Sequence, residues 1–160
     1  MNVSQSVVAD EHEWVRNRAP TVVALIDTVR ADLCDQFGTE VGTVTLGQYH
    51  AAVDEVFANG DLAVNVAALT RLLRDLDVDG DYPGFVVDEL LGRELAGMVA
   101  GTQPLRLLGE ATFHYADVLT HGDAGDPAGA DDLDAALAAG FQTRLPGWEW
   151  TESRSPFESE

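Results

Sequence analysis

Apolar residues recur along most of this chain with the period of an α-helix. In residues 20–38 they fall at positions i, i+3, i+4, i+7, i+11 and i+15, which is the spacing of one side of a helix. The members of this set are Val22, Leu25, Ile26, Val29, Leu33 and Phe37. Pro20 suits the first turn of such a helix, and Gly38 suits its end. The pattern therefore predicts an amphipathic helix whose apolar side faces a core.

Several other stretches repeat this period between recognisable start and stop signals. Thr45 and Gln48 form a capping-box pattern, and Asn59-Gly60 suits the boundary between two helices. Longer helices are expected over residues 45–58, 61–76, 83–100 and 103–121, and shorter ones over 4–18 and 131–139. The alternation that is typical of strands is nearly absent. We predict an all-α, single-domain bundle of five to six helices joined by short connections.

The length of 160 residues is that of one domain with a substantial core. We expect residues 1–145 to form the bundle, with the Gly- and Asp-rich segment 122–130 as a flexible connector. Residues 146–160 lack apolar periodicity, so we expect an irregular, partly disordered acidic C-terminal tail.

A line of small residues lies on the helix expected over residues 83–100. Gly92, Ala96 and Ala100 recur every four residues, so they share one side of that helix. Small side chains let a second helix approach closely, either inside the bundle or across a dimer. We expect the contact to be internal.

Charge changes this picture by pointing to the solvent in which the protein works. The chain has 28 acidic and nine basic residues, all nine of them arginine, for a net charge of −19. Repulsion on this scale destabilises a compact state in dilute buffer. At molar salt the Debye length falls to about 3 Å, which screens the repulsion. The composition, with no lysine and one isoleucine, resembles that of proteins from salt-in halophilic archaea. We therefore expect a soluble halophilic protein of the cytoplasm.

The same composition argues against several classes of function. No apolar run reaches 18 residues and no cationic leader is present, so no membrane association is expected. Nine scattered arginines offer no basic patch for phosphates, which argues against nucleic acid. A helix-turn-helix regulator within residues 45–76 remains an alternative. The common nucleotide-binding and hydrolase signatures are missing, and the single Cys34 excludes an internal disulfide. A non-enzymatic protein is favoured.

An Asp-rich segment between two expected helices is one candidate cation site. It resembles the first half of an EF-hand loop, in which alternate carboxylates precede a sharply turning glycine, here Gly80. The resemblance fails at the twelfth position, where Val86 replaces the bidentate acid. The candidate ligands are Asp75, Asp77, Asp79 and Asp81. A loosely bound K⁺, Na⁺ or Ca²⁺ is one interpretation, and a solvated helix-capping turn is the other.

A second candidate lies on the helix expected over residues 103–121. Four potential ligands share a sector of about 60°, a spacing used by metal sites in helical bundles. These residues are Glu110, His114, Asp117 and His121. His12 or His50 would have to complete the set from other helices. The adjoining sector is apolar, and it consists of Leu107, Leu108, Ala111, Tyr115, Val118 and Leu119. The alternative is therefore a solvated polar stripe, with the apolar sector facing the core.

Two tryptophans near the C-terminus, Trp148 and Trp150, complete the candidate residues. Tryptophan anchors many interfaces, although it also closes the edges of cores. We therefore expect a protein-binding accessory, chaperone-like or regulatory factor that uses an apolar groove or this segment. Its partner would be another protein or a second copy. We expect no cofactor or an unknown one, apart from a divalent metal or loosely bound K⁺ or Na⁺ at the candidate sites above. The alternative is a helical-bundle metal protein or enzyme that uses the stripe on residues 110–121.

Overall fold

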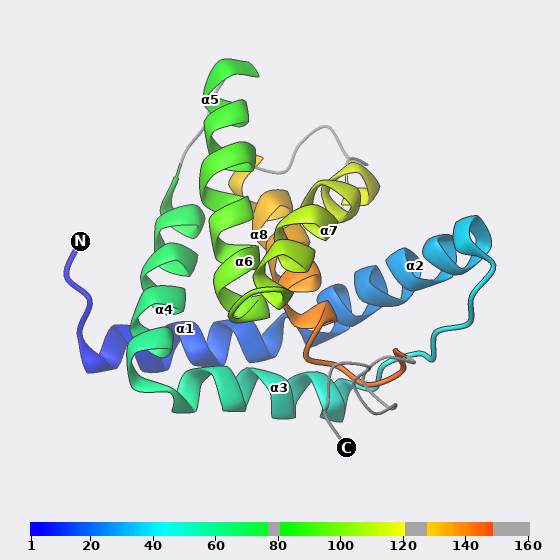
Figure 1. Ribbon diagram of the computed structural model, residues 1–160. Coiled ribbons are helices and arrows are strands. Elements are labelled where there is room, and N and C mark those ends of the chain that lie inside the picture. The colour runs from blue at the N-terminus through cyan, green and yellow to red at the C-terminus, as the bar shows by residue number, and fades with distance from the viewer. Residues whose placement is uncertain (77–80, 121–127, 149–160) are drawn as a thin grey trace.

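Every element in the described part of the chain is a helix. The computed structural model describes the backbone of residues 1–76, 81–120 and 128–148, with all side chains except those of residues 81–83, 88 and 128–130. In chain order (Figure 1) the helices are α1 (Gln5–Asn17), α2 (Ala19–Phe37), α3 (Leu46–Ala58), α4 (Gly60–Asp75), α5 (Asp81–Val86), the π-helical η1 (Val87–Gly92), α6 (Arg93–Ala100), α7 (Leu105–Thr120) and α8 (Ala128–Gln142). The prediction of an all-α fold is confirmed.

The predicted total of five to six helices is too low, because all seven segments with helical period form helices. The described residues form seven when α5, η1 and α6 are counted as one helix that runs through a π-helical turn. Both segments expected to be short are full elements, and α8 continues to Gln142 instead of ending near Ala139. Gly140 does not stop this helix. A Cβ atom at Gly140 would lie 2.6 Å from Cβ of Val99, so the glycine permits close contact with α6.

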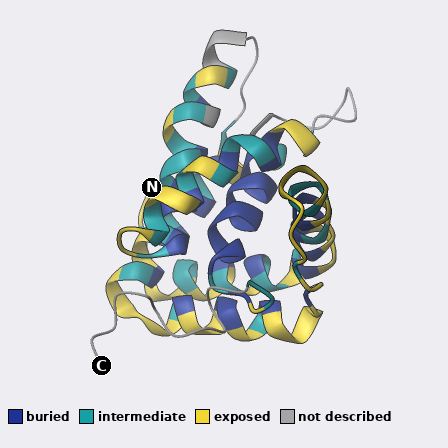
Figure 2. Cartoon of the chain, turned by 45° about the vertical axis from the view of Figure 1, so that its right-hand side comes forward, coloured by how far each residue is buried: buried dark blue, intermediate teal, exposed yellow. Residues whose placement is uncertain are grey.

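The core is built around α8, which Figure 2 shows as a continuous dark blue helix among its neighbours. Every residue from Asp132 to Thr143 is buried. The helix contacts α2, α3, α4, η1, α6 and α7. Its alanines let these helices come close, while Leu133, Leu137 and Phe141 fill the space between them. The segment expected to be a minor helix is therefore the centre of the fold.

The line of small residues on η1 and α6 receives α7 and α8. A Cβ atom at Gly92 would lie 2.5 Å from the ring of Phe113 on α7. One at Gly109, also on α7, would lie 2.6 Å from Cβ of Ala100 and 2.8 Å from the carbonyl oxygen of Ala96. The expectation of an internal contact is confirmed, because these helices approach so closely that there is no room for a methyl group.

Helix ends follow the signals in the sequence. Thr45 and Gln48 form the predicted capping box at the start of α3, with hydrogen bonds of 3.2 Å and 2.9 Å. Ser4 accepts a hydrogen bond from the Val7 amide and caps α1. Gly38 ends α2 with a φ of 60°, a left-handed conformation that favours glycine.

Each arginine that the structure describes has an acceptor within the protein, mostly on another element. The most buried is Arg30 on α2, which donates to Gln142 at 2.5 Å and to the carbonyl oxygens of Gly42 at 2.6 Å and Pro146 at 2.8 Å. Its guanidinium lies 5.4 Å from the ring centre of Trp148. Burial lowers the pKa of Arg30. The few cations of this acidic chain therefore join helices to one another.

Within the described residues, no single helix is both long and apolar enough to cross a membrane. Only α3 and α4 taken together, with a bend of 110° between them, satisfy criteria of length and composition.

Candidate functional site

Helix α7 is rotated relative to the orientation expected from its sequence. Its buried residues are Gly109, Phe113, Ala116 and Asp117, which we call the inner face of α7. The apolar sector expected to face the core points outward instead. Leu107 is 61% exposed and Val118 is 72% exposed, and Leu108 and Leu119 are also exposed. The interpretation that placed this sector inside is therefore wrong.

Contact distance explains the rotation. The inner face consists of two small residues, one aromatic ring and Asp117, and Gly109 allows the backbone of α7 to approach that of α6. Such close contact brings many atoms into van der Waals range and leaves few voids. Leucines at the same positions would hold the two helices apart. Helical periodicity marks both sectors as apolar, and the smaller residues determine which one is inside.

The polar stripe lies along the boundary between the inner face and solvent. Asp117 is buried, while Glu110 and His114 are partly exposed. Glu110 accepts a hydrogen bond of 3.1 Å from Arg106, and His114 lies 3.6 Å from Glu89 on η1. His121 lies outside the described residues. In its described part the stripe is only partly exposed, and Glu110 and His114 contact Arg106 and Glu89 instead of converging as ligands.

Among the residues that the structure describes, no three His, Cys, Asp or Glu side chains lie close enough together to hold a metal ion. His12 contacts Asp54 at 2.7 Å and stacks on Phe57, and His50 approaches the carbonyl oxygen of Arg16. These interactions lie between α1 and α3, whereas His114 pairs with η1. The described geometry therefore gives no support to the metal site. With His121 outside it, the site stays an untested prediction.

The Asp-rich segment is only partly described. Asp75 is exposed at the end of α4, and Asp81 begins α5. Asp77 and Asp79 lie outside the described residues, so the cation site predicted here also stays a prediction.

Of the two candidate tryptophans, Trp148 is described by the structure and Trp150 is not. Trp148 lies on the body of the protein, where its indole nitrogen donates a 3.0 Å hydrogen bond to the carbonyl oxygen of Gln142. Trp150 and the rest of the expected disordered tail lie outside the described residues. Phe141 and Leu145 are buried in the core, so truncation at residue 141 would remove core residues together with the tail.

The alternative of a helix-turn-helix is not favoured by the geometry of α3 and α4. The two helices meet at 110°, but Asn59 alone separates them. The two arginines of α4, Arg71 and Arg74, are bonded to Glu11 on α1. They therefore do not form a basic face directed at DNA.

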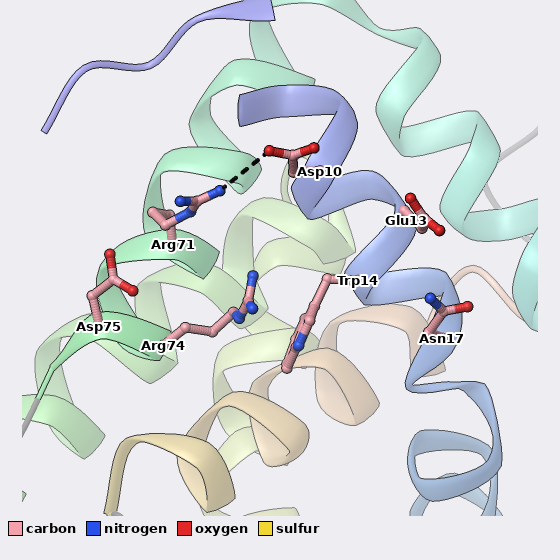
Figure 3. Close-up of a pocket in the computed structure, with 7 residues that line it drawn as sticks. All are labelled: Asp10, Glu13, Trp14, Asn17, Arg71, Arg74 and Asp75. Atoms are coloured by element: carbon pink, nitrogen blue, oxygen red, sulfur yellow. Dashed lines mark ion pairs between the residues drawn. The ribbon is translucent and has the colours of Figure 1, made fainter. Parts of the chain in front are cut away.

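A cleft of about 360 Å³ between α1 and α4 contains these arginines (Figure 3). It is lined by Asp10, Glu13, Trp14, Asn17, Arg71, Arg74 and Asp75. Trp14 and Arg74 project toward each other from the two helices, and the guanidinium lies 4.6 Å from the centre of the indole ring. Arg71 points toward Asp10, at 3.8 Å.

A completely buried carboxylate, Glu11, explains why the arginines gather here. Arg71 donates to it at 2.5 Å, and Arg74 donates to both of its oxygens at 2.8 Å. Burial of an unpaired carboxylate would be very unfavourable, and two guanidiniums compensate for it. The hydrogen bond to Glu11 raises the pKa of Arg71. With three further carboxylates in its lining, the cleft has no surplus of positive charge for an anion. We interpret it as an ion-pair network that joins α1 to α4.

A second cleft, of about 610 Å³, lies between the start of α4 and the junction of α6 and α7. Its two arginines are also engaged within the protein. Arg106 binds Glu94 at 2.6 Å, which raises the pKa of Arg106. Arg144 donates to the carbonyl oxygen of Val99 at 2.5 Å. These contacts hold α7 and the segment after α8 against α6.

A further feature of the described surface is the apolar sector of α7, which is exposed apart from the half-buried Tyr115. We call it the outer face of α7, and it consists of Leu107, Leu108, Ala111, Tyr115, Val118 and Leu119. It contains no charged residue, although the chain has 37 charged residues in all, 28 acidic and nine basic. The outer face presents on the order of 400 Å² of apolar surface, a scale that marks interaction sites on monomers.

One polar contact fixes the centre of the outer face. The hydroxyl of Tyr115 donates to Asp32 and accepts a 2.6 Å hydrogen bond from Gln36, both on α2. The ring is therefore held in place while its neighbours remain exposed. A preorganised aromatic residue loses little conformational freedom when a partner binds.

Sequence reasoning named every residue of the outer face but assigned it to the core. It missed the buried Glu11 altogether. A signal for Glu11 was present, because it lies four residues before Val15 and three after Val8, on the apolar side of α1. Its pairing with Arg71 and Arg74 requires knowledge of which helices are neighbours, which the pattern does not provide.

Fold and surfaces together define a strongly acidic, all-α helical domain with one uncharged apolar face. A family model matches the whole chain, residues 1–160, and the chain belongs to that family, described as "Domain of unknown function (DUF7984)". No curated protein and no solved structure matches the chain.

Proposed function

We propose that this protein is a non-enzymatic protein-binding factor of a high-salt cytoplasm, and that the outer face of α7 is its binding surface. The observation that carries the proposal is the combination of exposure and neutrality. Leu107 and Val118 are largely exposed on a face without a single charge, in a chain with a net charge of −19. Depletion of charge at the centre is a compositional feature of protein interfaces.

High salt strengthens this argument. Exposed hydrocarbon is driven into contact more strongly by concentrated salts that are excluded from protein surfaces. A chain adapted to such conditions, with no lysine stems on its surface, would gain by replacing six neighbouring apolar residues. Their retention supports a role in binding another protein, as an accessory, chaperone-like or regulatory factor.

A capture experiment with the full-length chain tests the proposal. Immobilised wild type, Val118→Asp and Val64→Asp would be incubated with native cell extract in molar KCl, and the retained proteins identified by mass spectrometry. Val64 is an exposed apolar residue on α4, 44% accessible, so it provides a matched control. We expect a defined partner, or the untagged chain itself, to be retained by wild type and Val64→Asp and lost with Val118→Asp. Equal retention by all three variants, or by none, would refute the proposal.

A further inference from the structure

The spacing of apolar residues on the outer face of α7 is compatible with pairing to a second copy of the same face. Its six residues are placed symmetrically about Phe113 along the helix axis. Leu107 and Leu119 lie equally far from Phe113, as do Leu108 and Val118, and Ala111 and Tyr115. A two-fold interface requires a surface patch that is complementary to itself. From this symmetry, and building on the proposed function of this face, we propose that the outer face of α7 pairs antiparallel with the same face of a second copy.

The sizes of the paired residues support this arrangement. In an antiparallel pair, Ala111 faces Tyr115 of the second copy, so a small side chain lies opposite a large one at the centre. Leu108 lies at the same level as Val118 of the second copy, while Leu107 and Leu119 flank opposite edges of the interface. Alternation of large and small residues allows two helices to interdigitate at a normal interaxial distance.

The area is also of the right scale. One side of a standard interface buries about 800 Å², of which a little over half is apolar, or about 450 Å². The outer face provides most of that amount from one helix. Because Tyr115 is already fixed by Asp32 and Gln36, part of the ordering cost is met before association.

Charge favours this face over a surface that carries carboxylates. Two chains with a net charge of −19 each repel one another, and the repulsion is strongest where carboxylates face carboxylates. Contact through a helix face whose own residues are uncharged brings few carboxylates together. The nearby Asp32 is already bonded to Tyr115, and salt screens the others. The dimer should therefore become tighter as salt increases, whereas an interface built from ion pairs would become weaker.

Sedimentation equilibrium of the full-length chain tests the pairing. The variants are wild type, Val118→Asp, Leu107→Ser and the control Val64→Asp, each checked for helicity by circular dichroism. In molar KCl we expect wild type and Val64→Asp to be dimers. Val118→Asp should raise the dissociation constant by about 100-fold or more, because each copy buries an unpaired charge. Leu107→Ser should raise it by a smaller factor. Lowering the salt should weaken the wild-type dimer.

Cross-linking tests the antiparallel register in a Cys34→Ser background. Leu108→Cys and Val118→Cys chains should form a disulfide with each other when mixed under oxidising conditions, because these positions lie at the same level near the contact line of an antiparallel pair. Neither should cross-link to itself, because residues 108 of the two copies would lie about 15 Å apart, well beyond disulfide reach. Self-cross-linking of Leu108→Cys alone would overturn the register.

The outcomes separate this inference from the proposed function. A monomeric wild type at 100-fold the concentration used for capture would overturn pairing with a second copy. The proposed function would still stand if Val118→Asp selectively lost a different partner. A dimer that Val118→Asp leaves intact would overturn the assignment of the dimer to the outer face of α7.

Discussion

The two faces of α7 are both mostly apolar, yet one is in the core and the other is in solvent. The inner face uses Gly109, Ala116 and Phe113, which allow α7 to lie directly against α6 and α8. The outer face uses leucines, a valine and a tyrosine, residues with more hydrocarbon to bury. The difference shows that closeness of approach, rather than hydrophobicity alone, decided how this helix is oriented. It also leaves the more hydrophobic face available for a partner.

The largest effect on stability is expected at Phe113, the aromatic residue of the inner face. Its ring lies against Gly92 and is completely buried. Phe113→Ala should lower the free energy of unfolding by about 3–5 kcal/mol, because it removes buried area and leaves a cavity. Urea denaturation in molar KCl measures this, with Leu107→Ala on the outer face as the matched control. A comparable loss of unfolding free energy in both variants would mean that the inner and outer faces contribute equally to stability.

A variant of Glu11 tests whether a buried ion-pair network stabilises the contact between α1 and α4. Glu11→Gln keeps the shape but removes the charge that Arg71 and Arg74 share. We expect a loss of about 3 kcal/mol in the free energy of unfolding, near the lower end for broken buried ion pairs because both arginines are partly exposed. Asp10→Asn, which changes an exposed carboxylate beside Arg71, serves as the control. An unchanged stability of Glu11→Gln would contradict the role assigned to the buried carboxylate.

Gly109 tests the contact distance itself. In Gly109→Ala, the new methyl group would lie 2.8 Å from the backbone carbonyl oxygen of Ala96, which cannot easily move. The expected loss is about 1–3 kcal/mol despite the higher helix propensity of alanine. Gly47→Ala on α3 is the control, because nothing there comes closer than 3.9 Å. Stabilisation by Gly109→Ala, measured in the same denaturation series, would show that closeness of approach does not orient α7.

Tyr115 lies where the outer face meets α2. Tyr115→Phe removes the hydroxyl that contacts Asp32 and Gln36 while keeping the ring. We expect a loss of about 1 kcal/mol in the free energy of unfolding. The dimer should weaken only slightly, because the apolar surface is retained. A large loss of dimer without any loss of stability would mean that the hydroxyl contacts the partner and not α2.

The smallest effect on the stability of the monomer is expected at Val118. Val118→Ser should change the free energy of unfolding by no more than about 0.5 kcal/mol when measured at low protein concentration. The residue is 72% exposed and leaves no cavity when shortened. Ala116→Ser on the inner face provides the contrast, and its larger loss would sharpen the distinction between the two faces.

Much of the fold could be predicted from the sequence. Helical period, the capping box at Thr45 and Gln48, and the ends at Gly38 and Asn59 located most helices to within a few residues. The central position of α8 could not be predicted in this way. Its alanines carry little hydrophobic signal, and their importance comes from the neighbours that they allow to approach.

The candidate site was predicted in its residues but not in its placement. Periodicity identified the apolar sector of α7 correctly and then assigned it to the core. It carries no information on how closely Gly109, compared with Leu108, lets a neighbouring helix approach. The buried pair of Glu11 with Arg74 joins residues far apart in sequence, and such pairs depend on which helices meet. The pattern within one helix shows which residues share a side, but packing against the other helices determines which side is buried.

The orientation of α7 and the role of its outer face can be tested together by the dependence of thermal unfolding on protein concentration. Wild type and Val118→Asp would be unfolded in molar KCl over a hundred-fold range of chain concentration. At the lowest concentration the two chains should have the same Tm, because Val118 contributes little to the monomer. The Tm of wild type should then rise with concentration, as mass action requires for a dimer, while that of Val118→Asp stays constant. A Val118→Asp chain that is less stable at every concentration would show that this face belongs to the core and would contradict the account.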